Sequence, residues 1–420
     1  MIKEDITKPL RRTFLWMKVI VLLCLLQTVS YGSGFQPANE QEKDPDFIFV
    51  GAGPVGLWTG IQLKIRQPDA DILFIERHEV YKRNHTLRIN KSSYAGRVVD
   101  PELEKLVKEL NGHVRNSYLE NRLLGLAKEI GIRINYKKVT GVSELISEFP
   151  DTQFIIGSDG SHSMVRKSIV GETLGFQRDL KYIVDIKYEV KGQAMRASYL
   201  NEYPTTKIMN HLATEYVGRS MDGVTPVTLR LFVDRDTFMS LSGSTFANPY
   251  ILGPDRNKIP KALDESIKIW MNMKAVIYGE KRVEGSEKVL PIRLQAYNSS
   301  SFVKSFPEEN RSFALVGDAA FGVPFFRSLN NGLLFGSQLA SALSRCMEKD
   351  RCEASLEKYS KFLVNLAKKE IAVAETKSTF LSSFGWLVSL SNIVPWQLNY
   401  WGKKKAELFK TRDPGYQNPI

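Results

Sequence analysis

The sequence of 420 residues is poor in the residues that build metal centres and disulfide scaffolds. It has three cysteines and five histidines, with no Cys-x-x-Cys pair and no cluster at metal-ligand spacing, so no metal site is expected. The histidines form no triad pattern either, and the catalytic residues stay unassigned. The chain also has no internal repeat, no heptad run and no long low-complexity tract.

What is present is the composition of an ordinary globular protein. Apolar residues make up 43% of the chain and charged residues 25%, and the length suits two or three domains. The net charge is +12, but lysine and arginine are scattered without a basic-aromatic stripe, so no nucleic-acid partner is expected. The positive charge favours attraction to anionic membranes or anionic cofactors.

The N-terminus has the features of a targeting segment. Arg11 and Arg12 precede an apolar run at 19–26, which is shorter than the roughly 20 residues of a spanning helix. The Arg-Arg-x-Phe-Leu pattern resembles bacterial twin-arginine export signals. We expect residues 1–34 to be a cleaved signal peptide or an uncleaved anchor; a start at Met17 would instead give a Sec-type signal. The protein is therefore expected to be exported (periplasmic or secreted) or membrane-associated.

The C-terminal part is apolar and aromatic. Residues 380–401 are rich in Phe, Trp and Leu, and three lysines follow at 403–405. Because Gly385 and Pro395 break helices, a single spanning helix is not expected. The segment is either an interfacial membrane anchor or a helical pair packed on the body of the protein.

The sequence leaves open whether two of the cysteines form a disulfide. Cys346 and Cys352 are six residues apart, which is ~9 Å along a continuous helix and too far for a disulfide. A break near residues 349–350 would bring them together, and an oxidising compartment would then favour the bond.

The most informative stretch begins with four apolar residues at 47–50, which predict a buried strand. Gly51, Gly53 and Gly56 then complete a Gly-x-Gly-x-x-Gly turn. The first glycine permits the tight turn, the second lets backbone approach a pyrophosphate, and the third lets the next helix pack closely. That helix is expected to start near Val55, with its N-terminal N–H groups facing the anion.

The residues that follow complete a dinucleotide-binding βαβ unit. A helix is predicted over 55–66 and a second buried strand over 72–75. Glu76 follows 20 residues after Gly56, where an acidic side chain meets a ribose hydroxyl. Further on, alternation at 182–190 and 227–233 predicts antiparallel strands. The remaining predicted elements are helices at 119–130, 259–275, 331–347 and 353–376, and strands at 132–136, 154–156 and 313–316.

Two more motifs follow in a fixed order. Residues 157–166 read Gly-Ser-Asp-Gly-Ser-His-Ser-Met-Val-Arg, and residues 314–320 read Ala-Leu-Val-Gly-Asp-Ala-Ala. Pro324 lies six residues beyond Asp318. With the glycine turn, this set resembles the class A flavoprotein monooxygenases of the para-hydroxybenzoate hydroxylase type. Their second and third motifs are D-G-x-x-S-x-V-R and G-D-A-A-x-x-x-x-P.

The resemblance covers most of residues 46–345 and implies FAD held by separate loops. The glycine turn would hold the pyrophosphate, Glu76 the ribose and Asp318 the ribityl chain. Pro324 would face the isoalloxazine ring, and N–H groups near Asn331 would stabilise the reduced flavin. The cofactor-binding residues so implied are Gly51, Gly53, Pro54, Val55, Gly56, Glu76, Arg77, Asp159, Gly160, Arg166, Gly317, Asp318, Pro324, Asn331 and Gly332.

The order of the predicted elements gives a discontinuous domain plan, and the resemblance identifies its two parts as the FAD-binding and substrate domains. The fold class is α/β: a discontinuous Rossmann-like FAD-binding domain with an inserted antiparallel-sheet substrate domain and a C-terminal helical segment. The predicted segments are the signal or anchor (1–34), the FAD-binding domain (35–179 and 301–375), the sheet domain (180–300) and the C-terminal segment (376–420).

The sequence departs from the family pattern at three places. Where members carry an arginine that contacts the flavin pyrophosphate, residues 117–119 are Ser-Tyr-Leu, with Arg115 and Arg122 nearby. The histidine after Gly-Asp-Ala-Ala is replaced by Phe321. Residues 324–328, Pro-Phe-Phe-Arg-Ser, replace a glycine-rich approach to the flavin.

The resemblance implies hydroxylation of a small organic substrate through a flavin hydroperoxide, with NAD(P)H as reductant. An exported protein would lack a supply of NAD(P)H, so a flavin oxidase or dehydrogenase using O2 or a quinone is the alternative. A non-catalytic flavin-binding module at a membrane is a third. Residues 76–87 are locally similar to MICAL-type monooxygenases, and the missing W-x-W-x-I-P motif argues against a flavin halogenase.

Overall fold

The computed structural model describes residues 43–80, 86–171, 174–195, 205–208, 211–218, 220–324, 327–348 and 351–380. The predicted signal or anchor (1–34) and most of the C-terminal segment (381–420) lie outside these residues. The described residues from Pro45 onward make up one compact unit that contains both main sheets. None of the described helices combines the length and apolar character that a membrane span requires.

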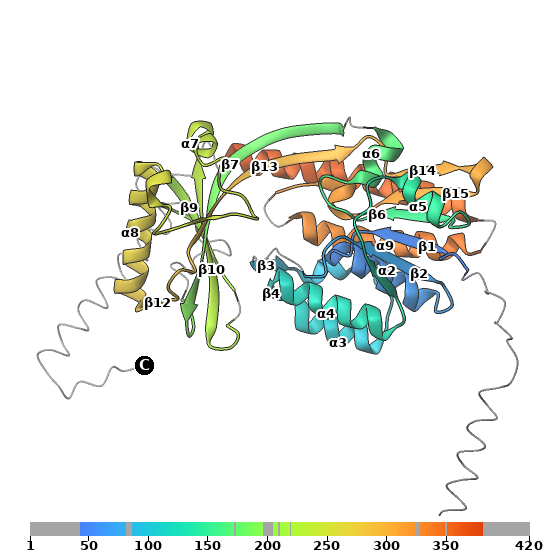
Figure 1. Cartoon of the computed structure of the whole chain (residues 1–420), viewed down its shortest axis with the longest axis horizontal. Coiled ribbons are helices and arrows are strands. Elements are labelled where there is room, and N and C mark those ends of the chain that lie inside the picture. The colour runs from blue at the N-terminus through green and yellow to red at the C-terminus, as the bar shows by residue number, and fades with distance from the viewer. Residues whose placement is uncertain are drawn as a thin grey trace, which may run out of the picture. The chain divides into compact units, whose positions relative to one another are not determined.

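The first sheet is a six-stranded sheet of the predicted Rossmann-like type (Figure 1). Its central strand β1 pairs in parallel with β2 on one side and with β6 on the other. Every residue of β1 is buried, which is why this strand is a continuous apolar run. In order across the sheet, the strands are β14 (Val303–Phe306), β15 (Arg311–Leu315), β6 (Phe154–Gly157), β1 (Phe47–Val50), β2 (Ile72–Glu76) and β5 (Arg133–Tyr136).

Helices pack around this sheet and onto one another. The crossover helix α2 contacts α9, and the indole N–H of Trp58 donates to Leu333 O and Ser337 Oγ, both at 2.9 Å. The helices of this part are α2 (Pro54–Arg66), α3 (Pro101–Leu110), α4 (Asn116–Glu129), α5 (Val142–Glu148), α6 (Met164–Val170) and α9 (Arg327–Cys346). A small antiparallel pair, β3 (Thr86–Ile89) and β4 (Gly112–Arg115), accompanies them.

The second sheet is antiparallel and interrupts the first in sequence, as predicted. It is built on two long strands, β7 (Leu174–Lys191) and β13 (Lys288–Ser299), which pair along their length with two register shifts (Figure 1). The other strands are β8 (Thr205–Ile208), β9 (His211–Val217), β10 (Val224–Val233), β11 (Tyr250–Ile251), β12 (Lys281–Arg282) and β16 (Phe321–Gly322).

Helix α8 (Lys261–Tyr278) covers one face of this sheet. It buries Leu263, Ile267 and Trp270 against alternate residues of the strands, among them Ile186 and Leu229. The helix begins after Pro260 and ends at Gly279, whose left-handed backbone caps it. A short helix, α7 (Arg235–Ser240), follows β10.

Most predicted elements are confirmed, with shifted ends. The strand predicted over 182–190 begins at Leu174, because its polar first half pairs with β13. The helix predicted over 331–347 begins at Arg327. The last helix, here called the C-terminal helix, covers residues 352–380, slightly beyond the predicted 353–376.

The two cysteines form a disulfide. Cys346 ends α9 and Cys352 begins the C-terminal helix, with their Cα atoms 3.9 Å apart. Of the two alternatives that the sequence left open, one continuous helix or two helices joined by a disulfide, the structure has the second.

Candidate cofactor site

The glycine turn is packed against the second motif. Gly51 has φ +98°, and a Cβ atom there would lie 2.7 Å from Ser158 O and 2.8 Å from Asp159 Cα. A Cβ atom on Gly56 would lie 2.7 Å from both Gly51 O and Ser158 Oγ. Both glycines are required, because the turn and the loop after β6 approach to backbone contact.

Gly53 differs from the other two glycines because its outer side is open. Apart from Gly53 itself and its chain neighbours, no atom lies within 4 Å of the position that its Cβ atom would take. Gly53 is the N-cap of α2, and no side chain caps this helix, which starts with Pro54 and Val55. The N-terminal N–H groups of α2 and its dipole are thus directed to a place where an anion can approach.

Glu76 stands at the end of β2, beside this turn. Its Oε2 accepts the N–H of Ala52 at 2.8 Å and its Oε1 accepts the N–H of His78 at 2.9 Å. Each carboxylate oxygen can accept a second hydrogen bond, so the side chain can still bind a ribose hydroxyl. Arg77, the next residue, is exposed.

The second motif is held by its own acid and arginine. Asp159 Oδ2 accepts the N–H of Met164 at 2.6 Å at the start of α6. Burial raises the pKa of Asp159, and hydrogen bonds from Ser163 and Met164 lower it only in part. Gly160, with φ +82°, makes the turn between Asp159 and α6.

Arg166 joins the second motif to the third. This buried side chain donates from Nη1 to Ala319 O at 2.9 Å and from Nη2 to Ser161 O at 2.6 Å. Its guanidinium lies 5.9 Å from the ring centre of Tyr297, whose hydroxyl donates to Asp318 O at 2.9 Å. Arg166 and Tyr297 therefore fix the loop that carries Asp318.

The third motif in turn reaches α2. Cβ atoms on Gly317 and Gly332 would lie 3.3 Å and 2.5 Å from side-chain atoms of Val55. Asp318 is half-buried and Pro324 is buried. Three motifs separated by more than 100 residues in sequence thus converge on the first turn of α2.

The start of α9 corrects one expectation. Because α9 begins at Arg327, Asn331 and Gly332 lie one turn inside the helix rather than at its N-terminus. The side chain of Asn331 donates from Nδ2 to Glu370 Oε2 at 2.9 Å. The N–H groups that remain unpaired at a helix start belong to its first four residues.

Comparison of the sequence with models of protein families and with curated proteins gives no match. Solved structures match at low identity. PqsL, described as a probable FAD-dependent monooxygenase from Pseudomonas aeruginosa, is 14% identical over 83% of this chain and 99% of its own, with TM-score 0.56. The flavin-dependent brominase Bmp2 is 12% identical over 88% and 100%, with TM-score 0.54. The aromatic hydroxylase CabE is 16% identical over 88% and 75%, with TM-score 0.52.

The chain has the flavin-monooxygenase fold. This fold is shared beyond oxygenases, since PyrE3, a Diels-Alderase, is 17% identical over 84% of this chain and 78% of its own, with TM-score 0.54. The fold therefore does not by itself fix the chemistry.

Arg115 and Arg122, the two arginines near the start of α4, each form an ion pair with a glutamate. Arg115 Nη2 donates to Glu189 on β7 at 3.3 Å. Arg122 donates to both carboxylate oxygens of Glu109, at 2.9 and 3.0 Å.

The face of the second sheet opposite α8 carries a buried ion pair that the sequence did not indicate. Arg230 on β10 donates to both oxygens of Asp185 on β7, at 2.8 and 3.0 Å, and lies 5.3 Å from the ring centre of Tyr216. Asp185 and Arg230 are 3% and 8% exposed. The alternating pattern predicted two different faces, but nothing local marks this pair among many charged residues.

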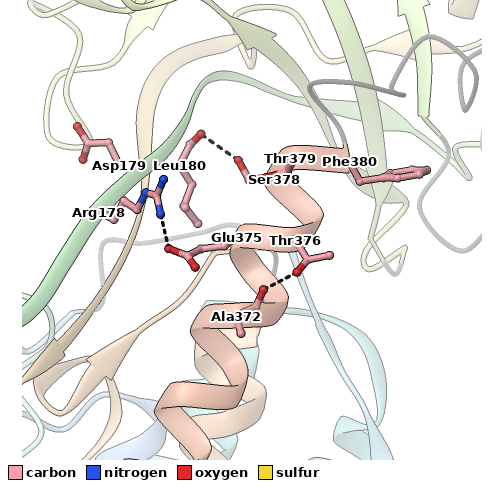
Figure 2. A pocket seen from close by; sticks show the side chains of 9 residues that line it. All are labelled: Arg178, Asp179, Leu180, Ala372, Glu375, Thr376, Ser378, Thr379 and Phe380. Atoms are coloured by element: carbon pink, nitrogen blue, oxygen red, sulfur yellow. Dashed lines mark hydrogen bonds and ion pairs between the residues drawn. The ribbon is translucent and has the colours of Figure 1, made fainter.

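A groove of about 620 Å³ lies between β7 and the C-terminal helix. Figure 2 shows an ion pair across it, from Arg178 to Glu375 at 2.8 Å, and a hydrogen bond from Ser378 Oγ to Leu180 O at 3.0 Å. None of the three motifs contributes to its lining. Among the described residues, no group of acidic, His and Cys side chains could hold a metal ion.

Proposed function

We propose that the chain is an FAD-dependent monooxygenase that hydroxylates a small organic substrate, with NAD(P)H as reductant. The observation that carries the proposal is the convergence of the three motifs on the open, uncapped start of α2. The likeness in fold to PqsL and CabE supports it. When bound, FAD supplies the redox chemistry, and the protein supplies binding, orientation and exclusion of water.

The residues of the site have distinct roles in this proposal. Gly53 and the start of α2 bind the pyrophosphate, and Glu76, next to Arg77, binds the adenosine ribose. Asp318, held by Arg166 and Tyr297, binds the ribityl chain, and Pro324 borders the ring. Asp159 and Gly160 keep the second loop in contact with the glycine turn.

We place the substrate against the face of the second sheet opposite α8. This face combines apolar side chains, such as Ile183, Phe232 and Leu294, with the paired Arg230 and Asp185. Because the face combines apolar side chains with an ion pair, an aromatic substrate with polar substituents suits it. PqsL has been solved with 2-aminobenzoylacetate and CabE is an aromatic hydroxylase, so aromatic compounds are the first to test.

The test is spectroscopic. Purified protein is expected to be yellow and to release FAD on denaturation; colourless protein that cannot be reconstituted with FAD would refute all flavin-dependent functions. Stopped-flow reduction by NADPH or NADH, accelerated by substrate, is expected for the monooxygenase.

A flavin oxidase is the second candidate, and the disulfide between Cys346 and Cys352 favours it. Such bonds persist in oxidising compartments, where NAD(P)H is not supplied. In that case the flavin would be bleached by an organic electron donor and not by NAD(P)H. We also propose that residues 1–34 direct export, in agreement with this bond.

A further inference from the structure

The C-terminal helix brings a buried acid to the first turns of α9. Glu370 is 3% exposed. Its Oε1 accepts from Arg327 Nη2 at 2.7 Å, and its Oε2 accepts from both Arg327 Nε and Asn331 Nδ2, the latter at 2.9 Å. One carboxylate therefore holds two residues of α9, one turn apart.

The ion pair with Glu370 offsets the unfavourable position of the Arg327 charge at the start of α9. A cation in the first turn of a helix is repelled by the partial positive charge of the helix N-terminus. An anion at the same place is stabilised, so Glu370 offsets both Arg327 and the dipole. Burial raises the pKa of Glu370, but the hydrogen bonds from Arg327 and Asn331 outweigh burial, and the pKa lies below its ordinary value.

The C-terminal helix is attached to the third motif at more than one point. Tyr359 donates its hydroxyl to Leu315 O at 2.8 Å, two residues before Gly317. The disulfide at Cys352 fixes its N-terminal end to the last residue of α9. The helix is thus attached at Cys352 and Tyr359, and Glu370 contacts α9 from it.

We propose that Glu370 is a positioning residue that holds the first turns of α9, and with them Pro324 and Asn331, in place for the flavin. The inference rests on the proposed function for its ligand. The contact between Glu370 and α9 is independent of that function.

The same helix offers a matched control. Glu375 also forms an ion pair with an arginine from another element, but its partner Arg178 lies on β7 and not on α9 (Figure 2). Glu370→Gln and Glu375→Gln each remove one carboxylate charge that is paired with an arginine, and only the buried Glu370 pairs with α9.

The experiment compares these variants in full-length protein, first without FAD and then with it. In Glu370→Gln, amide hydrogen exchange over residues 327–334 is expected to be faster than in wild type. Affinity for FAD is expected to fall about tenfold, because a charge-assisted contact is lost. The reduction potential of bound flavin is expected to become more positive, because the negative charge that is removed is buried beside the first turns of α9. Glu375→Gln is expected to match wild type in all three.

Equal exchange and equal FAD affinity in the two variants would overturn the inference. If wild type binds no FAD, the proposed function fails, while exchange in the FAD-free protein still tests the contact. Should Glu370→Gln not fold, the double variant Arg327→Met/Glu370→Met removes both charges and keeps apolar bulk. It is expected to fold and to show the same loosening of α9; tight FAD binding and wild-type exchange in it would also overturn the inference.

Discussion

At the scale of single residues, the glycines of the first motif differ in why a side chain is excluded. Gly51 and Gly56 are small because backbone and Ser158 approach them closely. Gly53 has free space where a Cβ atom would stand, so its smallness serves something other than the packing of the protein. A methyl group there would contact no protein atom beyond the chain neighbours and would stand where we propose that the pyrophosphate binds.

This difference predicts the outcome of one substitution. Gly53→Ala is expected to fold with near wild-type stability and to lose FAD affinity at least tenfold, because the methyl group blocks the approach of the pyrophosphate. Gly125→Ala in α4 is the control, since no atom lies within 4 Å of its Cβ position either. Thermal unfolding and fluorescence titration with FAD measure the two effects. Unchanged FAD affinity in Gly53→Ala would contradict the assignment of the turn.

Beneath the second sheet, three charged residues form a buried cluster. Lys274 Nζ lies 2.8 Å from Oε1 of Glu215 and 2.8 Å from Oε1 of Glu280. The side chains are almost fully buried, with one ammonium between two carboxyls. Burial raises the pKa of Glu280, and Lys274 lowers it only in part.

The cluster predicts a pH dependence of stability. A carboxyl group with a raised pKa in the folded state stabilises fully below its unfolded pKa of about 4.3, and this contribution is lost as pH rises through the folded pKa. Glu280→Gln mimics the protonated form and is expected to flatten the fall of the unfolding free energy above about pH 4.3. Urea unfolding at several pH values measures the slope. The exposed Glu284→Gln in the next turn should leave the slope as in wild type, and parallel curves for Glu280→Gln and wild type would argue against the assignment.

At the scale of elements, the sequence predicted correctly those helices and strands that are determined by contiguous residues. The strand at 47–50 and the helix after it follow from an apolar run and a glycine turn that are contiguous in sequence. The start of α9 could not be predicted in the same way, because it is stabilised by Glu370, some 40 residues away. Likewise, the first half of β7 is polar and is a strand only because β13 pairs with it.

The prediction of site residues has the same limit, because contacts between residues far apart in sequence are not visible in a local pattern. The motif residues were predicted because their spacing resembles a known family. Glu370 was missed because it is one of several acids on a charged helix, and only the fold shows which of them is buried. Arg230 and Asp185 were missed for the same reason, since cross-strand register decides their pairing.

The disulfide belongs to this scale, since it joins two helices. It closes a short loop, for which the loss of chain entropy in the unfolded state predicts about 2 kcal/mol of stabilisation. Cys346→Ser/Cys352→Ser is expected to be less stable by about this amount. Dithiothreitol should lower the stability of wild type toward that of the variant and leave the variant unchanged; a reductant effect of equal size on both would show that the bond is not its cause.

At the scale of the whole molecule, the site depends on chain segments that the sequence separates. Gly51 comes from the first part of the Rossmann-like sheet, Asp159 from the loop after β6, and Asp318 from the part that follows the inserted antiparallel sheet. Arg166 bonds the second of these segments to the third. A cofactor that contacts all three would add stability to the assembled chain, because ligands that bind only the folded state shift unfolding.

The proposed export of the protein also concerns the whole chain, because it links the N-terminal segment to the disulfide near the C-terminus. Export through the twin-arginine route would let the protein fold around its cofactor first, and the oxidising compartment would then form the bond between Cys346 and Cys352. In a bacterial host, replacing Arg11 and Arg12 by lysine is expected to retain the protein in the cytoplasm with both cysteines reduced. The third cysteine, Cys24, lies in the predicted signal segment, so both proteins carry Cys24→Ser. Labelling with a maleimide polymer then counts the free thiols: none in the exported protein with Arg11 and Arg12, and two in the retained variant. Continued export of the lysine variant would instead favour a Sec-type signal that starts at Met17, and free thiols in exported wild type would contradict the disulfide.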